Sequence, residues 1–513
     1  PGSRVKNLRS PISSKSGSRT TAWWERHLGL VIVMALGLDL LLAVISRWSF
    51  IQLKNLGLER GEWTIFGAVM VAMILLTTIT TVFDLQIFKG EAERYWLYGP
   101  APGLTLSGYG PILDALFVLP MLPYLIVSKL MGMSSEFALN LAMRIPLIVG
   151  SVFMIGATAR LVTCVGLDRR AKKIAFYGLV LNPVIIEMAL WTPEALIVGV
   201  LVVGVVLVFE DRPISAGVMF GLAVAAKYWP LFAGPLLLLY VWRTQGRAAA
   251  LRWLGSSAAV TSLLFIVYWG ITYLQMGSLG EFVRLLHQRL PYFAGSQASS
   301  YSTVWSLYNI PRHILALASL GGWVTTLETH SFLILLGLFA LVVCLFVAGR
   351  PTKPRALMAV GAVLTLAASV NSLSVAGFAL WSIPFLIVGF PYSPRAKWLV
   401  VSAVAAWSSG VLVTLFIEPV TYWLLHTSPS LDRIATNTAA WMQAHVINVQ
   451  AADTFGFLFC LGLALISFAL MFEISTTITW FDSDRRSPRE IAFVIDRVRR
   501  WRSHFRVDQS GGS

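Results

Sequence analysis

Residues 331–348 read SFLILLGLFALVVCLFVA, which is eighteen consecutive residues without a charged side chain. This run approaches the ~20 apolar residues that a helix needs to cross the hydrocarbon core of a bilayer. A membrane-spanning β-strand would instead alternate apolar and polar residues over only ~10 positions. The run therefore predicts a transmembrane helix.

Comparable apolar runs recur on both sides of this one. They lie at 28–46, 64–83, 110–132, 137–165, 174–189, 194–210, 214–242, 254–275, 356–371, 377–391, 398–417 and 453–472. The run 214–242 contains Lys227 and Pro230, and it is long enough for one kinked span or for two half-helices. The sequence thus predicts an all-α, polytopic transmembrane helical bundle of about 12–14 spans.

The composition excludes other classes of protein. Hydrophobic residues make up 57% of the chain and charged residues 13%, whereas a soluble domain is under half apolar and about a quarter charged. The net charge of +15 comes from tails and short loops, so we expect anionic lipid headgroups as its partner, not nucleic acid. All three cysteines lie in apolar runs, so we expect no disulfide framework, no metal and no cofactor.

Charge also predicts sidedness, because cytoplasmic loops of membrane proteins are rich in Lys and Arg. The basic loops at 169–173, 243–252 and 350–355 are expected in the cytoplasm, and 276–330, 371–376 and 418–452 outside it. We expect three regions in a multi-pass plasma-membrane protein. They are a basic disordered cytoplasmic tail at 1–27, a transmembrane core at 28–480, and a basic cytoplasmic tail at 481–513 that contains an amphipathic helix.

The loop after the second apolar run is rich in residues that can carry chemistry. Asp84 stands at the mouth of a helix, aromatic residues such as Tyr98 follow, and Tyr109-Gly110-Pro111 returns the chain to an apolar run. An ionisable residue next to the membrane core suggests a functional site, and sugars are held by carboxylates and aromatic faces. The alternative is an interfacial aromatic belt with a solvated acid.

The order Asp84, Phe88, Tyr98 and Tyr109-Gly110-Pro111 resembles the first extracytoplasmic loop of GT-C glycosyltransferases, and in particular of bacterial polyprenol-phosphate-mannose mannosyltransferases and GPI mannosyltransferase I. Four later stretches resemble motifs of the same enzymes in the same order. They are Asn182-Pro183 with Trp191 to Glu194, Gly217 to Gly221 with Lys227 and Pro230, His287-Gln288-Arg289 with Ser302 and Trp305, and Phe378 with Trp381 and Pro384. Glu194 stands where these enzymes usually have Asp, and Gly377-Phe378 replaces Gln-Tyr.

This resemblance implies a GT-C-like enzyme that moves a hexose, mannose above all, from a polyprenyl-phosphate sugar to a lipid-linked or glycan acceptor. The transfer would invert the anomeric carbon on the extracytoplasmic side. Asp84 would be the catalytic base, and Arg289, His287 and Lys227 would hold the donor phosphate. The remaining substrate contacts would come from Tyr98, Tyr109, Trp191, Glu194, Trp305 and Trp381.

Each residue also has an ordinary explanation. Lys227 could extend from a helix end toward water, His287 could be a solvated loop residue, and Arg289 could bind a lipid headgroup. Glu194 and Glu187 could be paired for structure. The whole chain could instead be a secondary transporter, which also has broken helices and intramembrane charges, or a lipid-binding scaffold.

One inconsistency concerns the side on which Asp84 emerges. If 1–27 is cytoplasmic and both 28–46 and 64–83 cross, Asp84 emerges in the cytoplasm, away from His287. Two changes together restore a shared side. The first change is that 28–46 does not cross fully, or that the N-terminal tail lies outside. The second change is that 137–165 folds back as two half-helices.

Overall fold

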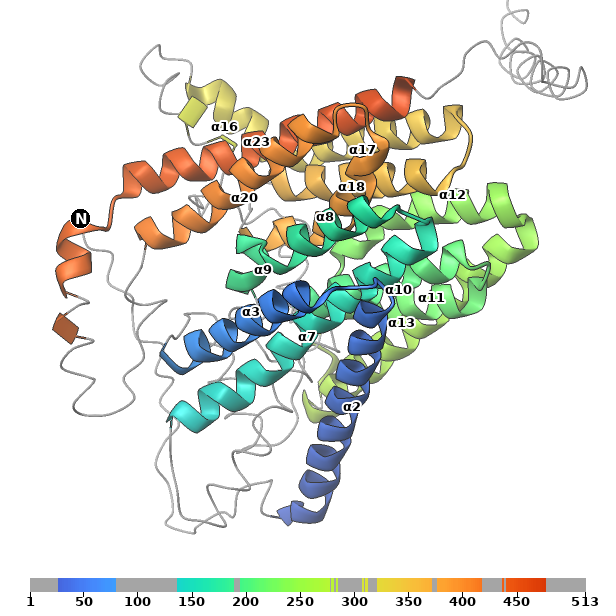
Figure 1. Ribbon diagram of the computed structural model, residues 1–513. Coiled ribbons are helices and arrows are strands. Elements are labelled where there is room, and N and C mark those ends of the chain that lie inside the picture. Colours follow the sequence, from blue (N-terminus) through green and yellow to red (C-terminus); the bar gives the residue numbers. More distant parts are fainter. Residues whose placement is uncertain are drawn as a thin grey trace, which may run out of the picture.

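The structure is a computed structural model of the 513-residue chain. It describes residues 26–79, 136–188, 194–276, 321–370, 376–417 and 440–476, together with short pieces at 278–280, 283–284, 307–308, 310–311 and 436–437. Within these ranges the regular elements are all helices (Figure 1). The prediction of an all-α helical protein is confirmed.

The first half of the chain contributes α2 (Leu28–Lys54), α3 (Arg60–Ile79), α7 (Glu136–Val165), α8 (Arg169–Val180), α9 (Pro183–Met188), α10 (Glu194–Phe209), α11 (Pro213–Ala226), η2 (Trp229–Ala233), α12 (Gly234–Gln245) and α13 (Arg247–Met276). The second half contributes α16 (Gly321–Thr329), α17 (Ser331–Ala348), α18 (Lys353–Val370), η4 (Ala376–Trp381), α19 (Ile383–Gly389), η5 (Phe390–Tyr392), α20 (Ala396–Ile417) and α23 (Val449–Thr476).

Among the described residues, seven helices are long and apolar enough to cross a membrane: α2, the part of α7 from Arg144 on, α13 to Ile271, α17, α18, α20 to Thr414, and α23. Three shorter apolar stretches accompany them, namely α10, α11 and Ile383–Tyr392. Helix α10 is buried on nearly all sides, as expected for a helix that is hydrophobic all round. The chain is therefore a multi-pass membrane protein.

Helices α11 and α13 pack closely along a stripe of small residues. A Cβ atom on Gly217 would lie 2.3 Å from the carbonyl oxygen of Trp253, and one on Gly221 would lie 2.7 Å from that of Ser257. The Thr261 hydroxyl also donates to the Gly221 carbonyl at 3.2 Å. Glycines four residues apart let helix backbones approach in this way, so they fix the position of α11 and of the residue that follows it, Lys227.

The basic loops meet at one end of the bundle, which we call the basic end. The Lys353 ammonium donates to the carbonyl of Cys164 at the end of α7 (3.3 Å), and Arg243 of α12 donates to the carbonyl of Val347 at the end of α17 (3.0 Å). These bonds join the three loops that follow α7, α12 and α17. The charge pattern of the sequence predicts this common location.

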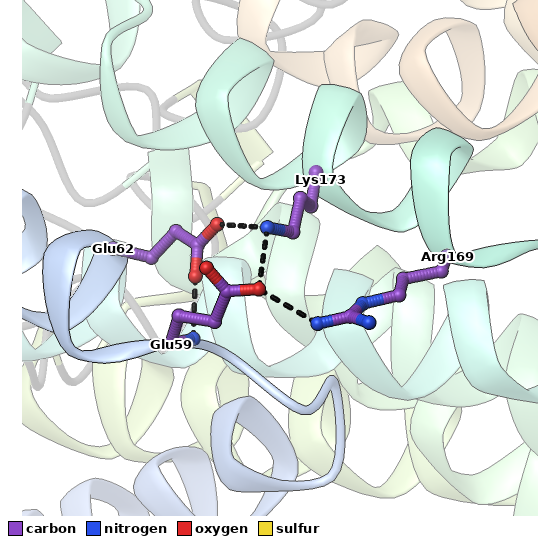
Figure 2. A network of polar contacts seen from close by, with 4 residues as sticks. All are labelled: Glu59, Glu62, Arg169 and Lys173. Carbon is purple, nitrogen blue, oxygen red and sulfur yellow. Dashed lines mark hydrogen bonds and ion pairs between the residues drawn. The ribbon is translucent and has the colours of Figure 1, made fainter.

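The turn between α2 and α3 also lies at the basic end, because acidic side chains tie it to α8 (Figure 2). Glu59 Oε1 accepts from Arg169 Nη2 at 2.7 Å and from Lys173 Nζ at 2.9 Å, and Glu62 Oε1 lies 3.0 Å from Lys173 Nζ. The hydrogen bond from Lys173 lowers the pKa of the Glu59 carboxyl, and the Arg169 charge adds to this. The same carboxylates raise the pKa of Lys173.

Two of the described helices bear on the changes that would restore a shared side. The predicted fold-back of 137–165 is wrong, because α7 is one helix that continues through Pro146. Helix α2 extends to Lys54 and, at ~1.5 Å per residue, is roughly 40 Å long, enough to cross a bilayer. Since α2 ends at the basic end, its first residue, Leu28, lies at the side of the bundle away from the basic loops.

Candidate functional site

Three predicted site residues, Glu194, Lys227 and Trp381, come together at the N-terminal end of α10, the end that lies away from the basic end. Glu194 is the first residue of α10, whose last residue, Phe209, lies beneath the Lys353 ammonium at the basic end. At ~1.5 Å per residue, roughly 22 Å separates Glu194 from Phe209. Lys227 follows α11 directly and Trp381 ends η4. The site therefore lies on the side of the bundle away from the basic loops.

The helical hairpin of α10 and α11 brings Glu194 and Lys227 together. The two helices pack against each other, and the turn between them contains Asp211, whose φ of 58° is the left-handed conformation. Glu194 stands sixteen residues before Glu210, and Lys227 stands sixteen residues after Asp211. Equal spacing from the turn of an antiparallel hairpin places the two side chains at the same depth.

Glu194 is a buried carboxylate that accepts from three donors. Its Oε1 atom is ion-paired with the Lys227 ammonium. Its Oε2 atom accepts from the indole nitrogens of Trp229 at 3.2 Å and of Trp381 at 3.0 Å. The Glu194 and Lys227 side chains are only 3% and 11% exposed. Because an isolated buried charge is very costly, each of these two charges stabilises the other.

Aromatic rings enclose this ion pair. The rings of Trp229 and Trp381 stack with centroids 4.7 Å apart, and those of Phe378 and Trp381 stack at 4.3 Å. The Lys227 ammonium also lies 5.3 Å from the centre of the Phe378 ring, within cation–π range. We call Glu194, Lys227, Trp229, Phe378 and Trp381 the Glu194 cluster. In it Trp381 stacks with two other rings, and its indole N–H donates to Glu194.

The other seven predicted site residues lie outside the described residues, and their roles stay predictions. They are Asp84, Tyr98, Tyr109, Trp191, His287, Arg289 and Trp305.

Two of the ordinary explanations can be compared with the structure. Lys227 does not extend toward water, because its ammonium pairs with Glu194 inside the bundle. Glu194 is indeed paired, and Glu187 accepts from the Thr414 hydroxyl at 2.6 Å. Within the described ranges no group of three His, Cys, Asp or Glu side chains gathers that could hold a metal ion.

Two members of the cluster, Phe378 and Trp229, were not among the predicted site residues. Trp229 follows Lys227 by two residues and precedes Pro230 in the same motif, which was a usable signal. It is fully buried, and its indole bonds Glu194. A fixed carboxylate, a fixed ammonium and several rings can together hold a sugar hydroxyl or an anionic phosphate, the two polar parts of an activated sugar.

The comparisons with known proteins agree with this chemistry. The sequence model of Glycosyltransferase family 87 matches residues 110–370, slightly more than half of the chain. The match includes Glu194, Lys227 and Trp229, and Phe378 and Trp381 lie just beyond it. No curated protein matches the chain. The extent of the family match shows that the chain belongs to glycosyltransferase family 87.

Proposed function

We propose that this glycosyltransferase transfers a hexose, specifically mannose, from a polyprenyl-phosphate sugar to a lipid-linked or glycan acceptor at the extracytoplasmic face of the plasma membrane. The acceptor hydroxyl would attack the anomeric carbon and displace the polyprenyl phosphate, which inverts the anomeric centre. This reaction requires a base for the hydroxyl proton and cations for the leaving phosphate.

The observation that carries the proposal is the position of the Glu194 cluster. Three of its five residues, Glu194, Lys227 and Trp229, lie inside the family match, and the cluster sits at the end of α10 opposite the basic end. Because basic loops favour the cytoplasm, this arrangement supports an active site that opens to the other side. A polyprenyl-phosphate donor brings its sugar to that membrane surface within the lipid itself.

In this proposal Lys227 and Arg289, with His287, bind the donor phosphate. Lys227 is held in place by Glu194, and Trp381 acts through Glu194 by bonding its carboxylate. Asp84 is the base. It follows the last residue of α3 by five residues. The first turn of α3, which contains Glu62, lies at the basic end. The direction of α3 therefore supports a location of Asp84 on the same side as the cluster.

The test is to incubate the purified full chain with labelled polyprenyl-phosphate mannose and with membrane glycolipid acceptors. Labelled acceptor product is expected. Polyprenyl-phosphate glucose is the control donor, which tests whether the enzyme prefers mannose. Transfer of glucose but not mannose would contradict the assigned sugar. Transfer from nucleotide sugars alone would overturn the assigned donor class.

A secondary transporter is the second candidate from the sequence, and the family match disfavours it. The same preparation distinguishes the two. Reconstituted vesicles that accumulate a solute, while the protein transfers no sugar from any donor, would support the transporter.

A further inference from the structure

A groove of about 850 Å³ runs between α8 and α20, starting at the basic end. One wall carries Ile174 and Tyr177 of α8, and the other carries Val400 and Val404 of α20. Phe390 of η5 contributes to its floor. Ile174 and Val404 are about half exposed, so the groove is open and lined mainly by apolar side chains. Its volume is in the range of pockets that hold small ligands.

The mouth of the groove carries positive charge. Arg170 and Lys397 both line it, both are exposed, and neither forms an ion pair within the part of the chain that the structure describes. Among the described residues that line the groove, the one acid is Asp168, which is engaged as the N-cap of α8, where its Oδ1 accepts from the Ala171 amide at 2.7 Å. The mouth therefore suits an anion.

The length of the groove suits one leaflet of a bilayer. Lys397 lies at the mouth and Trp407 lies at the inner end of the α20 wall. Ten residues of helix separate them, which is roughly 15 Å. This is half of the ~30 Å hydrocarbon core, so the groove has the length of a single acyl chain that starts at the membrane surface.

Helices α8 and α20 each rest on other helices beside this groove. Helix α8 packs on α7 and α19, and α20 packs on α23. The described part of the chain thus leaves a groove between α8 and α20 that a molecule from the lipid phase could enter.

We propose that this groove is a lipid site that holds one acyl chain of an anionic phospholipid, with its phosphate between Arg170 and Lys397. The combination of a cationic mouth and an apolar channel one leaflet long matches an amphiphile with an anionic head. The mouth of the groove lies at the basic end, away from the Glu194 cluster.

The experiment measures the lipid that the full chain retains in detergent micelles, by native mass spectrometry, after addition of phosphatidylglycerol or phosphatidylcholine. Wild type should retain phosphatidylglycerol in preference to phosphatidylcholine. Val404→Trp fills the channel and should abolish retention. Val71→Trp is the matched control, because Val71 is also about half exposed but lies on α3, away from the groove; it should behave as wild type.

A second variant tests the head group without touching the channel. The double substitution Arg170→Gln/Lys397→Gln changes only exposed side chains and should reduce the preference for phosphatidylglycerol by roughly tenfold or more. The control Arg247→Gln/Arg252→Gln removes equal charge from α13 and should leave the preference unchanged.

Three outcomes would overturn the proposal. The first is retention by Val404→Trp equal to wild type, and the second is equal retention of the two lipids by wild type. The third is displacement of phosphatidylglycerol by equimolar polyprenyl phosphate, which would make the groove a site for the donor lipid. Sugar transfer by these variants, measured separately, reports on the proposed function alone.

Discussion

The replacement Glu194→Gln tests whether the Glu194 cluster is a site or only a structural pair. Glutamate offers two acceptor oxygens, one for Lys227 and one for the indoles of Trp229 and Trp381. Glutamine keeps one acceptor and adds an NH₂ donor. If its oxygen faces Lys227, the NH₂ group meets two indole N–H donors. If the amide is flipped, the NH₂ group meets the ammonium.

The expected cost follows from the burial of the pair. Removal of one partner from a buried ion pair costs about 3–5 kcal/mol, mostly because the other charge stays buried. Since Lys227 retains 11% exposure, we expect the lower part of this range, about 3 kcal/mol. The thermal unfolding midpoint in detergent should fall by several degrees, and sugar transfer should fall with it.

The double variant Glu194→Gln/Lys227→Met separates stability from function. Methionine removes the orphaned charge, and neutral replacement of both partners of a buried pair is often tolerated, so much of the thermal stability should return. Sugar transfer should stay low, because the phosphate loses a cation. If the double variant regains both stability and transfer, the pair is structural only. If Glu194→Gln melts like wild type, the described ion pair is refuted.

Three further perturbations have defined outcomes. Gly217→Ala should lower the stability to thermal unfolding by about 1–3 kcal/mol through overpacking, because its Cβ would lie 2.3 Å from a carbonyl oxygen of α13. The control Gly204→Ala, whose Cβ would lie 3.5 Å from its nearest atom, should be near neutral. The pKa of Glu59 is lowered in the fold, so its stabilising effect is present above pH 4.5 and is lost as the pH falls through the folded pKa. Glu59→Gln should therefore lower the thermal midpoint at pH 7, and its difference from wild type should shrink as the pH falls below 4.5 and when 1 M salt is added. Identical curves for both proteins would show that the ion pair with Lys173 does not stabilise the fold. Asp84→Asn should reduce turnover by ~10²–10⁴-fold with an unchanged thermal midpoint, and a variant with normal turnover would move the base to another acid.

The fold was predictable where apolar length decides it. The run 331–348 coincides with α17, since a long uncharged stretch has few alternatives to a spanning helix. The fold-back at 137–165 was wrong: it was invoked to bring Asp84 to the same side as His287, whereas the chain continues as one helix through Pro146. Proline removes one backbone hydrogen bond, but neighbouring helices can compensate for that loss within a bundle. Helix α7 packs on α2 and α10, contacts that a single run of sequence does not show.

The candidate site was predictable as a set of residues but not as an arrangement. Glu194 and Lys227 were selected separately, because 214–242 was treated as one kinked span or two half-helices. The hairpin that makes them neighbours depends on where α11 begins, at Pro213 after the turn. The link of Glu59 to Lys173 joins residues 114 positions apart, and that contact follows from tertiary packing alone.

The place where α2 ends constrains how many times the chain crosses the membrane. Helix α2 runs toward the basic end, so the chain enters it from the opposite side. Helix α23 ends at the basic end, because Glu473 near its last turn pairs with Arg395 just before α20, at 2.6 Å. A chain that starts on one side of a membrane and finishes on the other crosses it an odd number of times. Between Leu28 and Thr476 the number of crossings is therefore odd, and reporter fusions placed before Leu28 and after Thr476 should accordingly give opposite signals.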